Sequence, residues 1–178
     1  DGKHVAIVVG GGNIWRGKNG TEFFMNPETA DYLGMTSTIY NCEVLSSVFK
    51  KRRVKHKVYS AIKLEHITKK YDIVKAKSYL DKGYVVILAG GTGNPGCSTD
   101  TASSLRASEL GCSKILMAKN GTDGVYDSDP RFNKDAKKYT KITHQEVIEQ
   151  QLGVMDLTAA TLCQSNNIDI VVFDMNVK

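Results

Sequence analysis

The stretch YVVILAGGTGNPGCSTDTASSLRASELG, residues 84–111, decides the fold of this chain. It opens with an apolar run typical of a buried strand and closes with a pattern typical of a helix. Between the two, residues 90–98 are small, polar and rich in glycine. Glycines beside the free amides of a helix N-terminus form a ready anion site. The stretch therefore predicts a strand, an anion-binding loop and a helix, with a plain connecting turn as the alternative.

Four continuous apolar runs predict the strands, at residues 5–9, 85–88, 115–118 and 170–173. Such runs are expected of parallel strands that are covered on both faces. Helical patterns alternate with them. The clearest one places Met35, Ile39, Cys42, Leu45 and Phe49 on one face. Four further helices are predicted: one that ends before Gly83, one that starts at Thr99, and two that cover residues 142–151 and 156–167. We expect an α/β fold with a mainly parallel sheet sandwiched by helices.

Length and composition are those of one compact globular domain over residues 1–178, with 41% hydrophobic and 24% charged residues. No apolar run approaches the roughly 20 residues of a membrane span, so we expect a cytoplasmic protein without a membrane partner. Cys42, Cys97, Cys112 and Cys163 are widely scattered, which predicts reduced thiols and neither a disulfide framework nor a zinc site.

The net charge of +5 suits anionic ligands, and its densest source is KKRRVKHK at residues 50–57. Cations at a helix C-terminus offset the helix dipole, which is the simpler interpretation. A nucleic-acid patch is the alternative. No aromatic residues interleave the run to stack on bases, so we favour the helix end.

The loops that follow the four apolar runs are the places to search for a ligand site, because open α/β sheets bind ligands at the carboxyl ends of their strands. Residues 10–17 begin with three consecutive glycines and include Arg16, whose guanidinium fork is suited to phosphate. Residues 119–130 hold Tyr126 and several acids, in a spacing that does not match a calcium loop. Together with residues 90–100 and 174–176, these loops predict two phosphorylated ligands that meet with a divalent cation, as in phosphoryl transfer. No P-loop motif is present.

Asp31 and Asp156 are single acids near predicted helix starts, where capping is the simpler interpretation. Ser98, Thr99 and Asp100 can cap the helix that follows the glycine-rich loop. Cys97 invites a nucleophile hypothesis, which we disfavour because no histidine is near it in the sequence.

The motifs VVGGGNIWRG, AGGTGNPGCSTDTA, NGTDGVYDSDP, VMDLTA and IVVFDMN, in this order, resemble the bacterial uridylate kinases of the amino-acid-kinase fold family. The resemblance runs along essentially the whole chain. It implies transfer of a phosphoryl group from ATP to UMP, giving ADP and UDP, with Mg²⁺. It also implies a cytoplasmic homohexamer that takes part in pyrimidine biosynthesis and is activated by GTP, a possible allosteric effector.

The resemblance also implies which residues form the site. UMP would be bound by Gly11, Asp31, Thr92, Gly93, Asn94, Pro95, Gly96, Cys97, Ser98 and Thr99. ATP would be bound by Gly12, Arg16, Asn120, Tyr126 and Asp129. Asp100 and Asp156 match acids near the reacting centre, with an orienting or magnesium-linked role, because a phosphate acceptor needs no general base. The direct metal ligands are left open.

This sequence departs from the family pattern in two respects. The family's first strand, with its lysine, and its last strands are expected to lie outside this sequence. Gly96 and Cys97 stand where the family usually has a pair of aromatic residues, which predicts a smaller and looser wall for the UMP base. The alternatives are another kinase of this fold that acts on a carboxylate or carbamate, and a non-catalytic module that binds nucleotides or nucleic acid.

Overall fold

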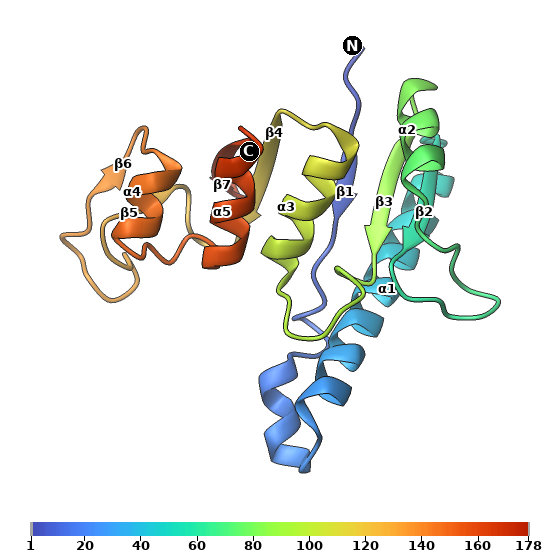
Figure 1. Ribbon diagram of the computed structural model, residues 1–178, viewed down its shortest axis with the longest axis horizontal. Coiled ribbons are helices and arrows are strands. Elements are labelled where there is room, and N and C mark those ends of the chain that lie inside the picture. Colours follow the sequence, from blue (N-terminus) through green and yellow to red (C-terminus); the bar gives the residue numbers. More distant parts are fainter. Residues whose placement is uncertain (1, 178) are drawn as a thin grey trace. The chain divides into compact units, whose positions relative to one another are not determined.

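A computed structural model describes residues 2–177 (Figure 1). Contacts within the chain group into two compact units, one up to Ala102 and one from Ser103 onward. The expectation of a single kinase domain over residues 1–178 stays a prediction. No helix among residues 2–177 is both long and apolar enough to cross a membrane.

The first unit is built on a three-stranded parallel sheet in the order β1-β3-β2, against which α1 and α2 pack. Its elements are β1 (Ala6–Val8), the 3-10 helix η1 (Gly17–Phe23), α1 (Pro27–Lys51), β2 (His56–Ser60), α2 (Ile73–Asp81) and β3 (Val85–Ala89). Since β1 and β3 are parallel neighbours, the loops that follow them leave the same edge of the sheet. This pairing confirms the prediction of parallel strands here.

The second unit contains a parallel pair, β4 with β7, and a short antiparallel pair, β5 with β6. Its elements are β4 (Lys114–Lys119), β5 (Val125–Tyr126), β6 (Lys138–Tyr139), α4 (His144–Glu149), α5 (Leu157–Ser165) and β7 (Asp169–Asp174). The helix α3 (Thr99–Leu110) begins in the first unit and ends in the second. The α/β class with parallel pairing is confirmed in both units.

The predicted helix face at residues 35–49 forms the core of the first unit. Ile39 and Cys42 are buried against Ile87 and Ala89 of β3. Burial in this core raises the pKa of the Cys42 thiol to about 12, so the thiol stays protonated. Burying a side chain such as Ile39 contributes about 1.5–3 kcal/mol, which holds α1 firmly against the sheet.

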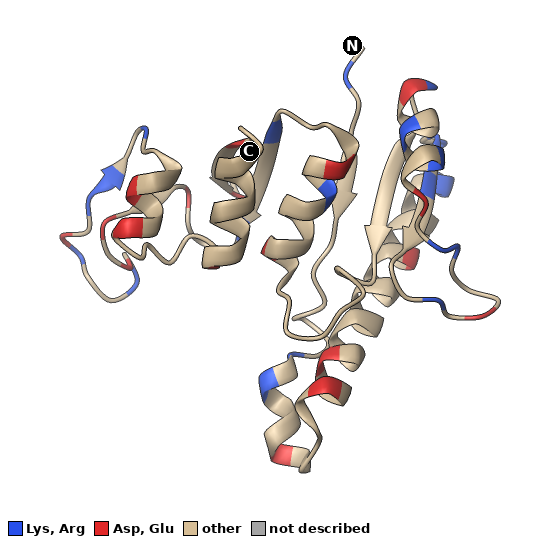
Figure 2. Cartoon of the chain, viewed as in Figure 1, with Lys and Arg blue, Asp and Glu red and all other residues tan. Residues whose placement is uncertain are grey.

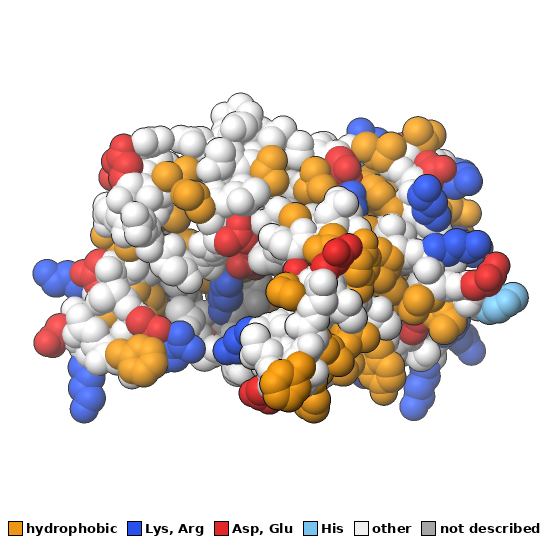
Figure 3. Space-filling model, turned by 60° about the horizontal axis from the view of Figure 1, so that its bottom comes forward, with side chains coloured by type: hydrophobic (Ala, Val, Ile, Leu, Met, Phe, Trp, Pro, Cys, Tyr) orange, Lys and Arg blue, Asp and Glu red, His pale blue; other side chains and the backbone are white. Residues whose placement is uncertain are grey.

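One part of the strand prediction is wrong. In β3, residues 86–89 are buried, as expected of a strand covered on both faces. In β4 and β7, burial alternates along the strand, and Leu116 is 68% exposed in this structure. Hydrophobic side chains are visible at several places on the face of the molecule drawn in Figure 3. The apolar runs of β4 and β7 thus have one partly open face among the described residues.

The basic run at residues 50–57 ends a helix, as predicted. Lys50 and Lys51 lie in the last turn of α1, and His56 already begins β2. Lysines and arginines are spread over many elements along the chain (Figure 2). Lys50 and Lys51 therefore stabilise the end of α1, because cations near a helix C-terminus interact favourably with the helix dipole.

Candidate functional site

The loop after β1 is a tight turn pressed against α1. The Gly11 carbonyl accepts hydrogen bonds from the backbone amides of Ile14 and Trp15, at 2.9 and 3.0 Å. A Cβ atom on Gly11 would lie 2.8 Å from the carbonyl oxygen of Gly34, so this position requires glycine. Arg16 Nε donates to the Gly12 carbonyl at 3.1 Å and folds the exposed guanidinium back over the turn. A cation thus lies directly beside the glycines, as a phosphate site needs.

The loop after β3 is organised by its own backbone and hydroxyl groups. The Gly93 amide donates to the Gly90 carbonyl at 3.0 Å, and the Asn94 amide donates to Thr92 Oγ1 at 3.1 Å. Ser98 Oγ accepts from the Thr101 amide at 3.1 Å. The side chain of Ser98, one of the three predicted capping residues, therefore caps α3.

Both glycine loops of the first unit lie close together. A Cβ atom on Gly10 would lie 3.5 Å from Thr99 Oγ1, so the β1 loop meets the start of α3. The predicted UMP residues Pro95, Gly96 and Cys97 complete the β3 loop. Gly96 adopts φ +76° with nothing within 4 Å of its Cβ position, and Cys97 is exposed. The chain is therefore open at this point, and the smaller, looser wall expected for the UMP base stays a prediction.

Asp31 joins this cluster across 65 residues of sequence. Its Oδ2 accepts a hydrogen bond from the Gly96 amide at 2.7 Å. The capping interpretation of Asp31 is wrong, because Asn26 caps α1 by accepting from the Glu28 amide at 2.8 Å. Asp31 also lines a pocket of about 260 Å³ between η1 and α1. A helical carboxylate thus reaches the loop that the resemblance assigns to UMP.

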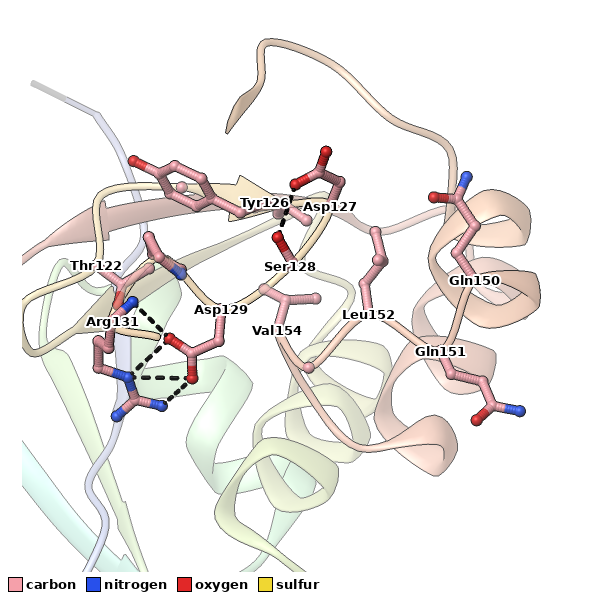
Figure 4. A pocket seen from close by; sticks show the side chains of 14 residues that line it. Thr122, Tyr126, Asp127, Ser128, Asp129, Arg131, Gln150, Gln151, Leu152 and Val154 are labelled. Atoms are coloured by element: carbon pink, nitrogen blue, oxygen red, sulfur yellow. Dashed lines mark hydrogen bonds and ion pairs between the residues drawn. The ribbon is translucent and has the colours of Figure 1, made fainter. Parts of the chain in front are cut away.

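The second unit holds a pocket of about 300 Å³, drawn in Figure 4. Tyr126 and Asp129, two of the residues predicted to bind ATP, lie on its wall. Hydrogen bonds from the Arg131 side chain, the shortest at 2.6 Å, lower the pKa of the Asp129 carboxyl group and keep it ionised at neutral pH. Asp129 is therefore already oriented by a cation, which favours hydrogen-bond acceptance over metal binding.

Asn120, the third residue predicted to bind ATP, is not in the wall of this pocket. Its Oδ1 accepts a hydrogen bond from Asn176 Nδ2 at 2.8 Å. Asp174 Oδ1 accepts from the Gly121 amide at 3.2 Å, and backbone hydrogen bonds lower the pKa of this carboxyl group, first that from Asn176. The loops after β4 and β7 are thus tied together, as their parallel pairing predicts. Whether the loops of all four strands share one rim stays a prediction.

The two acids predicted near the reacting centre both occupy helix starts. Asp100 lies in the first turn of α3. Asp156 is the N-cap of α5, where Oδ1 accepts from the Ala159 amide at 2.9 Å. The capping interpretation of Asp156 is therefore confirmed, and its role in the reaction stays a prediction.

An asparagine at position 156 separates these two roles, because Asn and Asp cap helices about equally well. We expect Asp156→Asn to leave the thermal midpoint of unfolding nearly unchanged while kcat falls by about tenfold or more, a loss of about 1.4 kcal/mol. Asp72→Asn is the matched control, since Asp72 caps α2 through the Lys75 amide and belongs to neither loop cluster. Unchanged kcat in both variants would leave Asp156 with a capping role alone.

Sequence reasoning missed three side chains that hold these loops. Thr38 and Asn41 of α1 bind the backbone of the two glycine loops, and Arg131 binds Asp129. For the α1 pair a signal existed, because both are polar residues beside the apolar face of a predicted helix. For Arg131 the adjacent DP dipeptide indicated only a turn.

Comparison with known proteins agrees with this geometry. The model of the amino acid kinase family matches residues 1–174. A uridylate kinase of Deinococcus radiodurans is 49% identical over 178 residues, covering 98% of this chain and 72% of that protein. Among solved structures, a UMP kinase from Ureaplasma parvum has a TM-score of 0.92 at 43% identity, covering 97% of this chain and 74% of that one. One from Bacillus anthracis has a TM-score of 0.94 at 38% identity, covering 98% and 72%.

The motifs that suggested the resemblance lie in the loops described above, and the matches extend over nearly all of this chain. The identity is far above the level at which only a fold is shared. The chain therefore belongs to the amino acid kinase family and, within it, to the uridylate kinases.

Proposed function

We propose that this chain is a nucleoside monophosphate kinase that transfers the γ-phosphoryl group of ATP to UMP, giving ADP and UDP for pyrimidine biosynthesis. The observation that carries the proposal is the contact between Asp31 and Gly96, at 2.7 Å, which ties α1 to the β3 loop. Asp31 also lies against Gly17, the residue that follows Arg16, and the Arg16 side chain donates to the Gly12 carbonyl of the β1 loop. Amides and a cation suit a nucleotide phosphate, and a carboxylate suits ribose hydroxyl groups.

In the proposed reaction, an oxygen of the UMP phosphate bonds to the γ-phosphorus of ATP. The bond from that phosphorus to the β–γ bridging oxygen breaks, and ADP leaves with the electron pair. The acceptor oxygen is already anionic, so no side chain has to remove a proton. The chain contributes by orienting the phosphates and stabilising their charge, mainly through loop amides and Arg16.

Magnesium fits the donor groups that are present. Among residues 2–177, no three His, Cys, Asp or Glu side chains form a metal cluster. Mg²⁺ in kinases is usually held by substrate phosphates, water and one or two carboxylates, so a full protein cage is not required. We propose an orienting or magnesium-linked role for Asp100 and for Asp156, each considered by itself, and leave the direct metal ligands open. When bound, the ion would neutralise charge on the phosphates.

The wider family properties are also proposals for this chain: a homohexamer, activation by GTP and a cytoplasmic location. The outer side of α1 supports an assembly. Tyr40, Val44 and Val48 recur every four residues and are 64%, 50% and 47% exposed. Apolar stripes of this kind are usually covered by a partner surface.

The proposed function is tested by coupled ADP release with UMP, CMP and AMP supplied separately. The assay is run on this chain and on a longer chain that carries the family's lysine-bearing first strand. We expect turnover with UMP well above that with CMP or AMP. No turnover from the longer chain, together with tight and salt-sensitive binding of RNA or DNA, would favour the non-catalytic module instead. Turnover with a carboxylate or carbamate would favour another kinase of this fold.

Arg16 provides a more specific test, because lysine keeps the charge but loses the guanidinium fork. We expect Arg16→Lys to lower kcat/KM by about tenfold, corresponding to about 1.4 kcal/mol of transition-state stabilisation. Arg52→Lys, the same change at the C-cap of α1, is the control and should leave kinetics unaltered. Equal kinetics for the Arg16 variant and the unmodified chain would remove Arg16 from the site.

A further inference from the structure

Thr38 of α1 holds the start of the β3 loop through its hydroxyl group. The Gly90 amide donates to Thr38 Oγ1 at 2.7 Å, and the same hydroxyl donates to the Met35 carbonyl at 2.7 Å. Thr38 is 5% exposed, so water does not replace either bond easily. Because the Thr38 hydroxyl donates its proton to the Met35 carbonyl, a lone pair of Thr38 Oγ1 accepts the hydrogen bond from the Gly90 amide.

Asn41, about one turn further along α1, holds the other loop. Its Nδ2 donates to the Gly10 carbonyl at 2.8 Å and to Asn13 Oδ1 at 2.7 Å. These contacts span 31 and 28 residues of sequence, so they are tertiary contacts and not part of a local turn. The amide of Asn41 therefore attaches the β1 loop at two points.

The backbone of the β1 loop also lies directly on this surface of α1. A Cβ atom on Gly11 would lie 2.8 Å from both the Gly34 carbonyl oxygen and Ser37 Cβ. The same helix carries Asp31, which binds Gly96 in the β3 loop. A single rigid helix, buried against the sheet through Ile39, thus contacts both glycine loops.

We propose that Thr38 and Asn41 are positioning residues for UMP, which set the spacing of the two glycine loops without touching the substrate. The inference rests on the proposed function, since it assigns a role within the same site. Loop amides stabilise a phosphate only when they are already oriented toward it, so a loop displaced by about 1 Å loses much of its effect. Removing the Thr38 hydroxyl would leave a buried Gly90 amide without its acceptor, and the loop would move to satisfy it.

The first experiment compares Thr38→Val, which keeps the side-chain shape, with Thr38→Ser, which keeps the hydroxyl. We expect Thr38→Val to raise KM for UMP by about tenfold while KM for ATP changes by less than about twofold. Thr38→Ser should restore most of the UMP affinity. Thr36→Val is the matched control, because within residues 2–177 the Thr36 hydroxyl bonds only to the Tyr32 carbonyl of its own helix.

A second variant covers the case in which Thr38→Val does not fold. Asn41 is only partly buried, so Asn41→Leu removes the donor to Gly10 at a position that tolerates an apolar side chain. We expect a similar rise in KM for UMP. Unaltered KM for UMP in folded Thr38→Val or Asn41→Leu protein would overturn the inference.

Amide hydrogen exchange at Gly90 gives a readout that does not depend on catalysis. We expect faster exchange at Gly90 in Thr38→Val than in Thr38→Ser or Thr36→Val. Equal protection in all three would overturn the positioning role even if activity fell. If the unmodified chain neither binds nor phosphorylates UMP, the proposed function fails and the UMP part of the inference fails with it. If the unmodified chain phosphorylates UMP but a variant has unaltered kinetics, the proposed function stands and only the positioning role of Thr38 and Asn41 is overturned.

Discussion

Gly90→Ala is expected to abolish most UMP-dependent turnover and to destabilise the first unit. Gly90 has φ +76°, which disfavours any L side chain. Its Cβ atom would also lie 2.6 Å from Ser60 Oγ and 2.9 Å from the Ile62 backbone nitrogen. Backbone at the end of β2 cannot move aside without disturbing the sheet, so the β3 loop must shift. We expect a loss of about 2–4 kcal/mol in the free energy of unfolding, from backbone strain and overpacking together.

Gly83→Ala separates these two causes. Gly83 follows α2 with φ +74°, and nothing lies within 4 Å of its Cβ position. This variant therefore has the backbone strain without the clash, and we expect a loss of only about 1 kcal/mol with unaltered KM for UMP. Urea unfolding and steady-state kinetics on both variants make the comparison. Equal losses would show that packing at Ser60 and Ile62 does not control the loop.

Asp31→Ala is expected to have the second largest effect, and to be specific for UMP. The variant loses the carboxylate that accepts from the Gly96 amide at 2.7 Å, a charge-assisted hydrogen bond. Such bonds contribute about 1.5–3 kcal/mol, so we expect KM for UMP to rise by roughly tenfold to a hundredfold. KM for ATP should change by less than about twofold.

Glu28→Ala is the control for Asp31, because Glu28 is an exposed acid in the first turn of the same helix. Since Asn26 caps α1, neither variant should lower the thermal midpoint by much. Circular dichroism melting and initial rates with each nucleotide varied in turn would measure both effects. Equal losses for UMP and ATP, with a lower midpoint, would assign Asp31 a structural role only.

The elements predicted best are those whose signals are local. Val85–Ala89 and Thr99–Leu110 appear where the apolar run and the capping hydroxyls placed them. The helix predicted from Met35 in fact begins at Pro27, after the Asn26 cap, a combination typical of helix starts. The strand His56–Ser60 was not predicted, because its first two residues belong to the basic run and the strand has no continuous apolar stretch.

The candidate site was predicted in its chemistry but only partly in its contacts. Resemblance placed Asp31 with the β3 loop, whereas its position in the sequence suggested a cap. Arg131 gave no functional signal, because a single polar residue in a turn is usually solvated. Asn41 gave only a weak one, its position beside the apolar face of a predicted helix. The strands Lys114–Lys119 and Asp169–Asp174 are half-exposed, although their apolar runs predicted strands covered on both faces. An apolar run shows that its residues prefer to be buried, but it does not show which other elements pack against each face of the strand.

The amino-acid sequence by itself determined the strand–loop–helix unit at residues 84–111, the glycines of its turn and the parallel α/β class, because backbone preference and capping act over a few residues. Only the tertiary structure decided that Thr38 and Asn41 hold the two glycine loops and that Asp31 reaches Gly96. Those contacts join residues 31 to 65 positions apart. They depend on how α1 packs on the sheet, which no local pattern encodes.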